Sequence, residues 1–192
     1  MNIIIEEEKF LPHCGCQIHL RLEKNKINVI KGVNGVGKTT LAHLMKERYF
    51  KDLTLIEQNP LQHFYQRRLI ELKNIFIAAK PQHFDLETLN RLWKMFDLER
   101  INLHSVKQLS GGENQSLKLA FGLSIKNSMI IIDEPSQYLD VHRKKQLTQF
   151  LAELMINHFV IIIEHEGQWL EHLPQKICEL RIEDKMLKAS YV

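Results

Sequence analysis

Two uninterrupted apolar runs limit most strongly how this chain of 192 residues can fold. They cover residues 129–132 and 159–163, and such runs are typical of strands buried on both faces of a sheet. A helical pattern at about 141–156 separates them. Because a strand, a helix and a second strand follow in this order, the sequence predicts an α/β fold with a mainly parallel sheet.

The other segments add further strands and one helical stretch. Apolar and polar residues alternate at 18–22, which predicts a half-buried strand, and residues 28–30 and 53–56 predict short apolar strands. From about 59 to 127 the pattern is helical, with Asp85 as an N-cap. We expect a single domain, residues 1–192, with a core at about 1–58 and 128–192, a helical subdomain at about 59–127, and a terminal hairpin at about 176–192.

The composition is that of an ordinary globular protein, and it narrows the choice of partners. The formal net charge is only +3, so charge alone does not indicate a nucleic-acid partner. Cys14, Cys16 and Cys178 cannot form a disulfide framework, which favours a cytoplasmic location. The sequence at 13–16, His-Cys-Gly-Cys, predicts either a turn or a metal site, and the turn is favoured because no second ligand cluster accompanies it. No segment approaches the roughly 20 apolar residues of a membrane helix, so work at a membrane would need a partner.

A glycine loop follows the strand predicted at 28–30, and its sequence fits G-x-x-x-x-G-K-[ST] at every fixed position. The glycines let successive backbone N–H groups face one anion, and the helix beginning at Lys38 adds its positive end. Lys38 would reach the β- and γ-phosphates of a nucleotide, and Thr39 would place its hydroxyl on Mg²⁺. A chance match in a glycine-rich turn is the alternative, but a strand precedes the loop and a helix follows it. The candidate nucleotide-binding residues here are Gly32, Val33, Asn34, Gly35, Val36, Gly37, Lys38 and Thr39.

Two acids end the apolar run at 129–132. An acid at the carboxyl end of a parallel strand lies near the phosphate loop, which makes Asp133 the natural partner of Mg²⁺. Glu134 is then available as the general base for a water that attacks the γ-phosphate. Solvated acids that open a turn before Pro135 are the alternative, and the phosphate loop favours the catalytic interpretation.

A serine and two glycines precede a helix that we predict at 113–126. The backbone amides of Ser110, Gly111 and Gly112 form a second anion-binding helix terminus. A plain N-cap is the common meaning of such a segment, but this one lies between the phosphate loop and the acidic pair.

In this order, the motifs resemble those of the ATP-binding cassette (ABC) ATPase family over nearly the whole chain. The segments that carry the resemblance are Gly32–Thr40 (Walker A, which includes Thr40), Gln58 (Q-loop), Leu109–Glu113 (LSGGE signature), Ile130–Glu134 (Walker B), Ser136–Asp140 (D-loop) and His165 (switch histidine). The family fold implied is a P-loop NTPase ABC-ATPase fold, with a mainly parallel core, N-terminal antiparallel strands and an inserted helical subdomain. One departure is that residues 114–117 lack the arginine often found in the signature helix, which puts a salt bridge there in doubt.

The resemblance also implies a composite site for ATP and Mg²⁺ between two cassettes, arranged head to tail. Ser110, Gly111 and Gly112 of one copy would contact the γ-phosphate held by Lys38 of the other. Lys38 counts with the catalytic residues for this reason.

Further roles implied by the resemblance fall outside these two motifs. Gln58 would sense Mg²⁺, Asp140 belongs to the D-loop, and His165 would hold the γ-phosphate and the attacking water. An aromatic residue before the phosphate loop usually stacks on adenine, and Phe10 is the candidate; it could equally pack under the first strands.

The leading hypothesis is the ATP-hydrolysing subunit of an ABC transporter, peripheral on the cytoplasmic face of the membrane and paired with a separate transmembrane subunit. A homodimer is expected, and nucleic acid is not an expected partner. The alternative is a soluble ABC ATPase that acts on ribosomes or nucleic acid, because residues 133–141 also resemble the ribosome-recycling members. A third interpretation, a regulatory cassette with poor turnover, is disfavoured by Lys38, Glu134 and His165.

Overall fold

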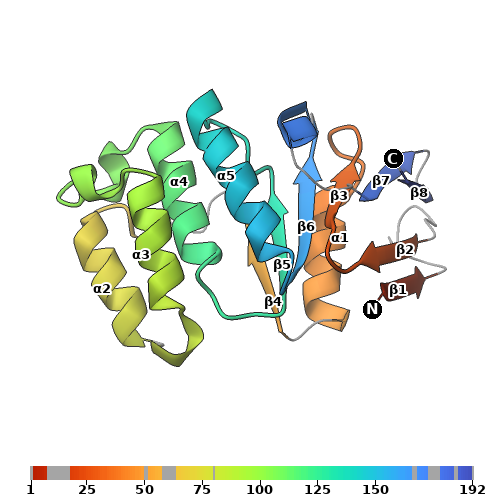
Figure 1. The fold of residues 1–192 in the computed structure, drawn as a ribbon, viewed down its shortest axis with the longest axis horizontal. Helices are drawn as coiled ribbons and strands as arrows, with labels where there is room; N and C mark the ends of the chain where they lie inside the picture. The colour runs from red at the N-terminus through yellow and green to blue at the C-terminus, as the bar shows by residue number, and fades with distance from the viewer. Residues whose placement is uncertain are drawn as a thin grey trace.

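A six-stranded sheet runs through the computed structural model, in the order β4-β5-β6-β3-β7-β8 (Figure 1). Neighbours from β4 to β7 are parallel, and β8 is antiparallel to β7. The bounds are β3 Ile27–Lys31, β4 Leu53–Ile56, β5 Met129–Asp133, β6 Phe159–Glu164, β7 Cys178–Glu183 and β8 Met186–Tyr191. The structure describes residues 2–7, 18–49, 52–57, 64–79, 81–165, 168–172, 178–183 and 186–191.

The strands β5 and β6 are buried along their whole length, and their side chains alternate between two hydrophobic cores. Ile130 and Ile132 lie in one core, whereas Ile131 lies in the other. Ile131 pairs with Ile161, so side chains on the same face line up across the strands. The two apolar runs are therefore strands covered on both faces, as the sequence predicts.

Helices cover the two faces of this sheet. The first core contains Leu147 and Leu151 of α5 (Val141–Leu154). The second core contains Leu41 of α1 (Lys38–Leu44) and Met45 of the π-helical turn that continues it (Met45–Tyr49). The phosphate loop therefore leads from a buried strand into a helix that packs on the same sheet.

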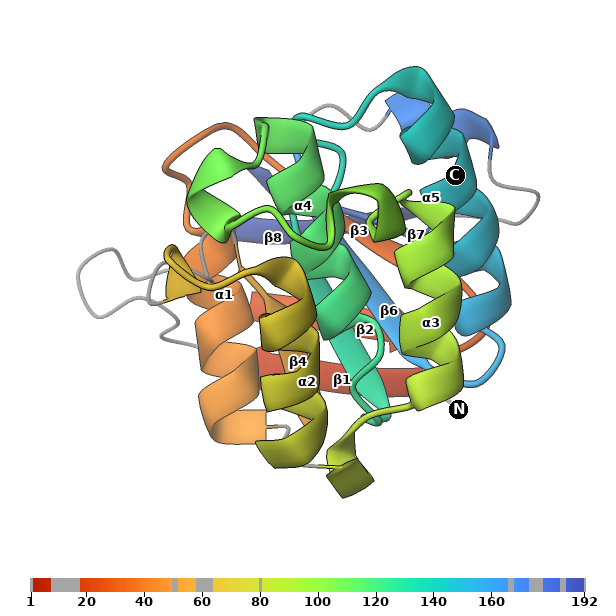
Figure 2. The ribbon, with the colours of Figure 1, turned by 90° about the vertical axis from the view of Figure 1, so that its left-hand side faces the viewer.

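Three helices stand beside the β4 edge of the sheet as a helical lobe (Figures 1 and 2). They are α2 (Leu69–Ala79), α3 (Leu86–Met95) and α4 (Gly111–Gly122), with short 3-10 turns at Pro81–His83, Glu99–Ile101 and Val106–Gln108. Asp85 caps α3 by accepting from the backbone N–H groups of Glu87 and Thr88. Trp93 and Phe121 join α3 to α4, with their ring centroids 5.6 Å apart.

The helix α4 differs from the prediction, because it begins at Gly111 and ends at Gly122 rather than covering 113–126. Ser110 caps its start. At its end the chain turns away: Lys126 N–H donates to the His83 carbonyl oxygen at 2.8 Å, and a β-bridge joins Ile125 to Phe84. These pairings with a distant segment satisfy the backbone, so the helix does not continue.

The two ends of the described chain lie at the far side from the helical lobe (Figure 1). The strands β1 (Asn2–Glu7) and β2 (Ile18–Glu23) form a separate antiparallel sheet, and β7 with β8 forms the expected hairpin. The fold class is thus confirmed: an α/β protein with a mainly parallel sheet, antiparallel strands near the N-terminus and inserted helices. In the described part of the chain, no helix combines the length and apolar character needed to cross a membrane.

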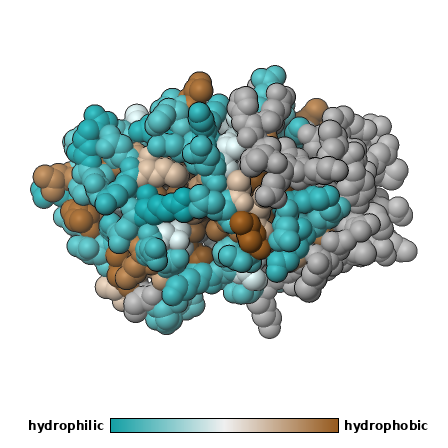
Figure 3. Space-filling view, in the orientation of Figure 1, coloured by the Kyte–Doolittle hydropathy of each residue, from teal (hydrophilic) through white to brown (hydrophobic). Residues whose placement is uncertain are grey.

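The face that carries α3 and α5 is largely hydrophilic (Figure 3). Apolar side chains on it stand singly among polar ones, as is usual for the surface of a globular protein. This face of the described residues therefore does not by itself indicate an apolar docking site.

Candidate nucleotide-binding site

The phosphate loop leaves β3 at Lys31 and enters α1 at Lys38. Gly35 and Gly37 have φ values of 78° and 102°, which glycine adopts without the steric cost of a Cβ. The buried Lys38 Nζ donates to the carbonyl oxygens of Gly32 at 2.8 Å and Val33 at 3.1 Å. The lysine ammonium therefore lies across the mouth of its own loop, where phosphate oxygens would meet it.

Thr39 and Asp133 form the next layer of the site. The Thr39 hydroxyl donates to Asp133 Oδ2 at 2.8 Å, and Asp133 is buried at the carboxyl end of β5. Burial raises the pKa of the Asp133 carboxyl, while the bond from Thr39 and the charge of Lys38 oppose that rise. A hydroxyl and a carboxylate side by side fit Mg²⁺, which binds one or two carboxylates together with phosphate oxygens.

Three sequence-predicted residues meet in one pocket of about 390 Å³. It is lined by Asn34 of the phosphate loop, Glu134 after β5 and His165 after β6. Glu134 has a φ of 49°, and its N–H donates to the Ile163 carbonyl oxygen at 2.9 Å. Strain of this kind in a non-glycine residue is common at functional sites, and here it turns the acid out of the β5 strand.

Two residues of α4 approach the segment Asp133–Pro135, although the sequence did not point to them. Gln115 Nε2 donates to the carbonyl oxygens of Glu134 at 3.2 Å and Pro135 at 3.1 Å. Lys118, one turn further along α4, is buried, and its charge interacts with Asp133 and Glu134. Burial lowers the pKa of the Lys118 ammonium to about 8, against the attraction of the two acids. A lysine in a helix core could have been noticed as a charge at an apolar position, since such residues are rarely buried unless paired.

The signature segment Leu109–Glu113 lies apart from this pocket, and none of Ser110, Gly111 and Gly112 lines it. Ser110 caps α4: its hydroxyl accepts from the Glu113 N–H at 3.3 Å, and its N–H donates to Glu113 Oε2 at 2.9 Å. The segment thus exposes the N-terminus of a helix, as predicted, outside the lining of the pocket.

The remaining candidates divide between described and undescribed positions. Thr40 is exposed on α1, and Asp140 caps α5 through a bond from the Arg143 N–H at 2.8 Å. Phe10 and Gln58 lie outside the described residues.

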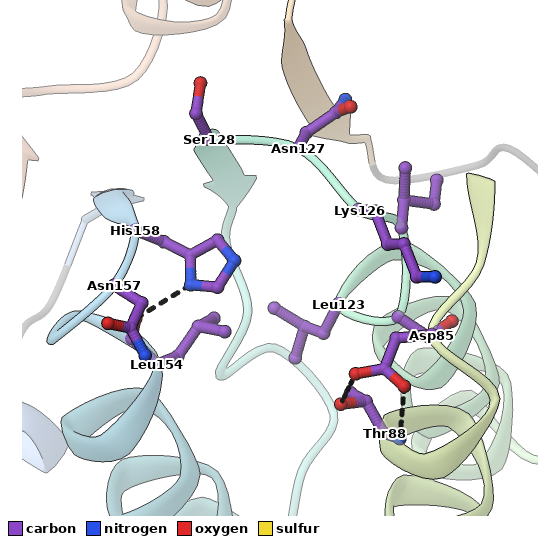
Figure 4. Close-up of a pocket in the computed structure, with 11 residues that line it drawn as sticks. Asp85, Thr88, Leu123, Lys126, Asn127, Ser128, Leu154, Asn157 and His158 are labelled. Carbon is purple, nitrogen blue, oxygen red and sulfur yellow. Dashed lines mark hydrogen bonds between the residues drawn. The ribbon is translucent and has the colours of Figure 1, made fainter. Parts of the chain in front are cut away.

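A second pocket, of about 310 Å³, lies at the opposite ends of β5 and β6 (Figure 4). Ser128 and His158, which precede those strands, line it together with Asp85 and Thr88 of the helical lobe. Several of its polar groups have partners within the chain, such as Asp85 Oδ2 with the Thr88 hydroxyl at 2.7 Å. Because the strands are parallel, this pocket is a full strand length from the phosphate loop and is not part of the nucleotide site.

The fold and the loop together define a P-loop nucleotide-binding domain. The family model described as "ABC transporter" matches residues 16–137. The chain therefore belongs to the ABC transporter family, as an ABC ATPase cassette.

Individual relatives agree with this assignment. The zinc import ATP-binding protein ZnuC of Rickettsia prowazekii is 28% identical over 156 residues, which cover 76% of this chain and 66% of that protein. ABC transporter E family member 1 of Arabidopsis thaliana is 28% identical over 179 residues, which cover 77% of this chain and 30% of that protein. The chain thus spans less than two thirds of each of these two relatives. A solved structure titled as the ATP binding subunit of an ABC transporter aligns with 100% of this chain and 90% of its own, with a TM-score of 0.80 at 15% identity, a likeness of fold alone.

Proposed function

We propose that this chain is the ATP-hydrolysing subunit of an ABC transporter, that it dimerises head to tail on ATP, and that it drives a separate membrane subunit from the cytoplasmic face. The observation that carries this proposal is that the phosphate-binding residues and the signature segment do not line the same pocket. The pocket lined by Asn34, Glu134 and His165 lies beside the Thr39–Asp133 pair, while Ser110 is exposed and does not line that pocket. A second copy would supply the missing signature contacts.

The chemistry proposed for the pocket is attack of water on the γ-phosphate. Lys38 and the loop N–H groups bind the phosphates, and Thr39 with Asp133 would hold Mg²⁺, which supplies positive charge to their oxygens. Glu134 takes a proton as the water oxygen bonds to phosphorus and the bridging P–O bond breaks. His165 donates a hydrogen bond to a γ-phosphate oxygen, a role that suits an imidazole because its ring nitrogens can donate and accept.

The variant Glu134→Gln tests the base and the dimer together. It keeps the size of the side chain and removes its basicity, so phosphate release should fall by about 100-fold or more. ATP should still bind, and the trapped complex should show twice the monomer mass by light scattering. Glu87→Gln, an exposed change on α3, is the matched control and should behave as wild type. Wild-type turnover in Glu134→Gln would show that another group is the base.

Fractionation of the cells that express the protein tests the membrane partner. We expect the tagged chain to co-purify with an integral membrane protein, since relatives of similar sequence carry the names of transporter ATP-binding proteins. Recovery with ribosomes instead would favour the soluble alternative and overturn the transport proposal.

A further inference from the structure

Both glycines of the signature segment lie against the D-loop (Ser136–Asp140) of the same chain. A Cβ on Gly111 would lie 3.1 Å from Cγ of Tyr138, and a Cβ on Gly112 would lie 2.8 Å from the Tyr138 carbonyl oxygen. Any larger residue at Gly112 would collide with backbone, which cannot move aside cheaply. The close approach of the D-loop is therefore one reason why the segment contains two glycines.

The backbone of Tyr138 is strained where it makes this approach. Its φ is 64°, in the left-handed region that is sterically unfavourable for a residue with a Cβ. The residue is 69% exposed, so burial of the ring in a core does not explain the strain. The ring instead lies over Gly111, with Cδ1 3.2 Å from the place of a Cβ there.

Arg143, in the first turn of α5, makes a second contact with the same segment. Its Nη1 lies 3.3 Å from the place of a Cβ on Gly112 and 3.5 Å from Asp140 Oδ2. Its charge also attracts Glu113, together with that of Arg100, whose Nη2 is 3.9 Å from Glu113 Oε1. The Arg143 side chain is only 20% exposed. Its guanidinium thus pairs with an acid of the D-loop, lies against Gly112 and adds positive charge near Glu113.

The signature helix has no arginine at residues 114–117. Ser116, within the stretch where that arginine is often found, donates to the Gly112 carbonyl oxygen at 2.8 Å inside its own helix. Arg143 of α5 places one cation beside the segment, in addition to Arg100. Arg143 belongs to the core and Gly112 to the helical lobe, so the contact joins the two parts at the place where the signature segment is presented.

We propose that Tyr138 and Arg143 are positioning residues that fix the signature segment against the D-loop, so that Ser110, Gly111 and Gly112 are held ready for the γ-phosphate bound by a second copy. The inference rests on the proposed head-to-tail dimer for its functional consequence, but the contact itself belongs to one chain. Holding groups in place before they meet the reacting phosphate matters because misplacement by about 1 Å can cost about 100-fold in rate.

Amide hydrogen exchange on the nucleotide-free protein tests the contact without any dimer. We expect Tyr138→Ala and Arg143→Met to raise exchange at residues 110–116 by about tenfold, since they remove the groups that hold this turn. Tyr138→Phe keeps the ring and should keep the protection. Arg91→Met removes an arginine that joins lobe and core through Glu153, away from the signature segment, and should leave exchange at 110–116 unchanged. Unchanged exchange in Tyr138→Ala and Arg143→Met would overturn the inference.

Steady-state kinetics tests the consequence. Tyr138→Ala and Arg143→Met should lower kcat by about tenfold or more, and should weaken ATP-driven dimerisation when combined with Glu134→Gln. Binding of a fluorescent ATP analogue to the monomer should stay within about twofold, because the phosphate loop is untouched. Tyr138→Phe should restore kcat, and Arg143→Lys should restore it in part, since lysine keeps the charge but not the planar donors.

The outcomes separate this inference from the function on which it rests. If the wild-type chain neither hydrolyses ATP nor dimerises, the proposed function fails, and hydrogen exchange alone decides the contact. If wild type does both and the two variants match it in kcat, the positioning role is wrong.

Discussion

Glu164 is a buried acid that has no part in the hydrolysis proposed above. It ends β6, directly before His165, and its Oε1 accepts from the Ser136 N–H at 3.2 Å and from Trp169 Nε1 at 3.0 Å. Burial raises the pKa of this carboxyl, and the nearby charge of Glu134 raises it further, against the two hydrogen bonds. Glu164 therefore forms part of the pocket wall, and its ionised form lowers the stability of the folded state.

The pH dependence of the free energy of unfolding should show the destabilising effect of the ionised Glu164 carboxylate. Because the folded-state pKa of Glu164 is above its unfolded value, the folded state holds the proton more tightly. Its contribution is thus favourable at low pH and is lost as the pH rises through the raised pKa. Glu164→Gln keeps an oxygen acceptor and removes the charge, so its free energy of unfolding should exceed that of wild type at pH 8, and the difference should shrink below pH 4. Urea unfolding at both pH values measures this, and a less stable variant at pH 8 would contradict it.

At the residue scale, proximity within one motif could be predicted from the sequence most directly. The glycines and Lys38 stand together in one loop, so their meeting could be predicted. Lys118 left one local signal, a charge at an apolar helix position, whereas Arg143 meets the signature segment through the packing of α5, which no local pattern reveals. The roles assigned to Phe10 and Gln58 stay predictions, since both lie outside the described residues.

At the scale of elements, α4 lies unusually close to β4. A Cβ on Gly122 would lie 2.4 Å from both Cγ1 and Cδ1 of the buried Ile56. This approach brings the signature helix against the edge strand of the sheet, and it needs a residue without a side chain.

Gly122→Ala should therefore destabilise the protein. Alanine gains about 1 kcal/mol of helix propensity over glycine, but overpacking a filled core costs about 1–3 kcal/mol. Because the added methyl group would collide with Ile56, we expect the steric cost to outweigh the gain in propensity. The net loss in the free energy of unfolding, measured with urea, should be about 1 kcal/mol. The loss should be smaller in an Ile56→Val background, which removes Cδ1; an equal loss in both backgrounds would show that the contact is not the cause.

The sequence predicted elements well where their side chains are fully buried. It predicted them less well where contacts with distant segments determine where an element ends. The runs in β5 and β6 are apolar on both faces, so their strand character was readable. The end of α4 was not, because it depends on bonds to His83 and Phe84, about forty residues earlier. The order of the strands was not readable either, since β3 pairs with strands that follow it by more than a hundred residues.

At the scale of the whole molecule, one ion pair ties the helical lobe to the core away from the site. Arg91 of α3 donates to the two carboxylate oxygens of Glu153 on α5, at 2.6 and 2.8 Å. The Arg91 guanidinium carbon also lies 5.3 Å from the ring centroid of Phe150. Both charged side chains are about half exposed, at 53% and 57%.

A double-mutant cycle of Arg91→Met and Glu153→Gln measures the coupling free energy of this ion pair. An exposed pair with two parallel bonds should give a coupling of about 0.5–1 kcal/mol. Salt screens exposed charges, so the coupling should fall by more than half in 1 M NaCl. A coupling that is large and independent of salt would mean that the pair is effectively buried in solution, contrary to its exposure in the structure.

The position of β3 also has a consequence for how the protein is made. This strand leads into the phosphate loop, yet its partners in the sheet are β6 and β7, with Asn28 opposite Ile161 on one side and Cys178 on the other. On a ribosome, residues 27–31 emerge long before either partner has been synthesised. The chain must therefore keep an apolar strand unpaired through most of translation, a period in which such segments are prone to aggregate. The nucleotide site is among the first parts to be translated and among the last that can be assembled.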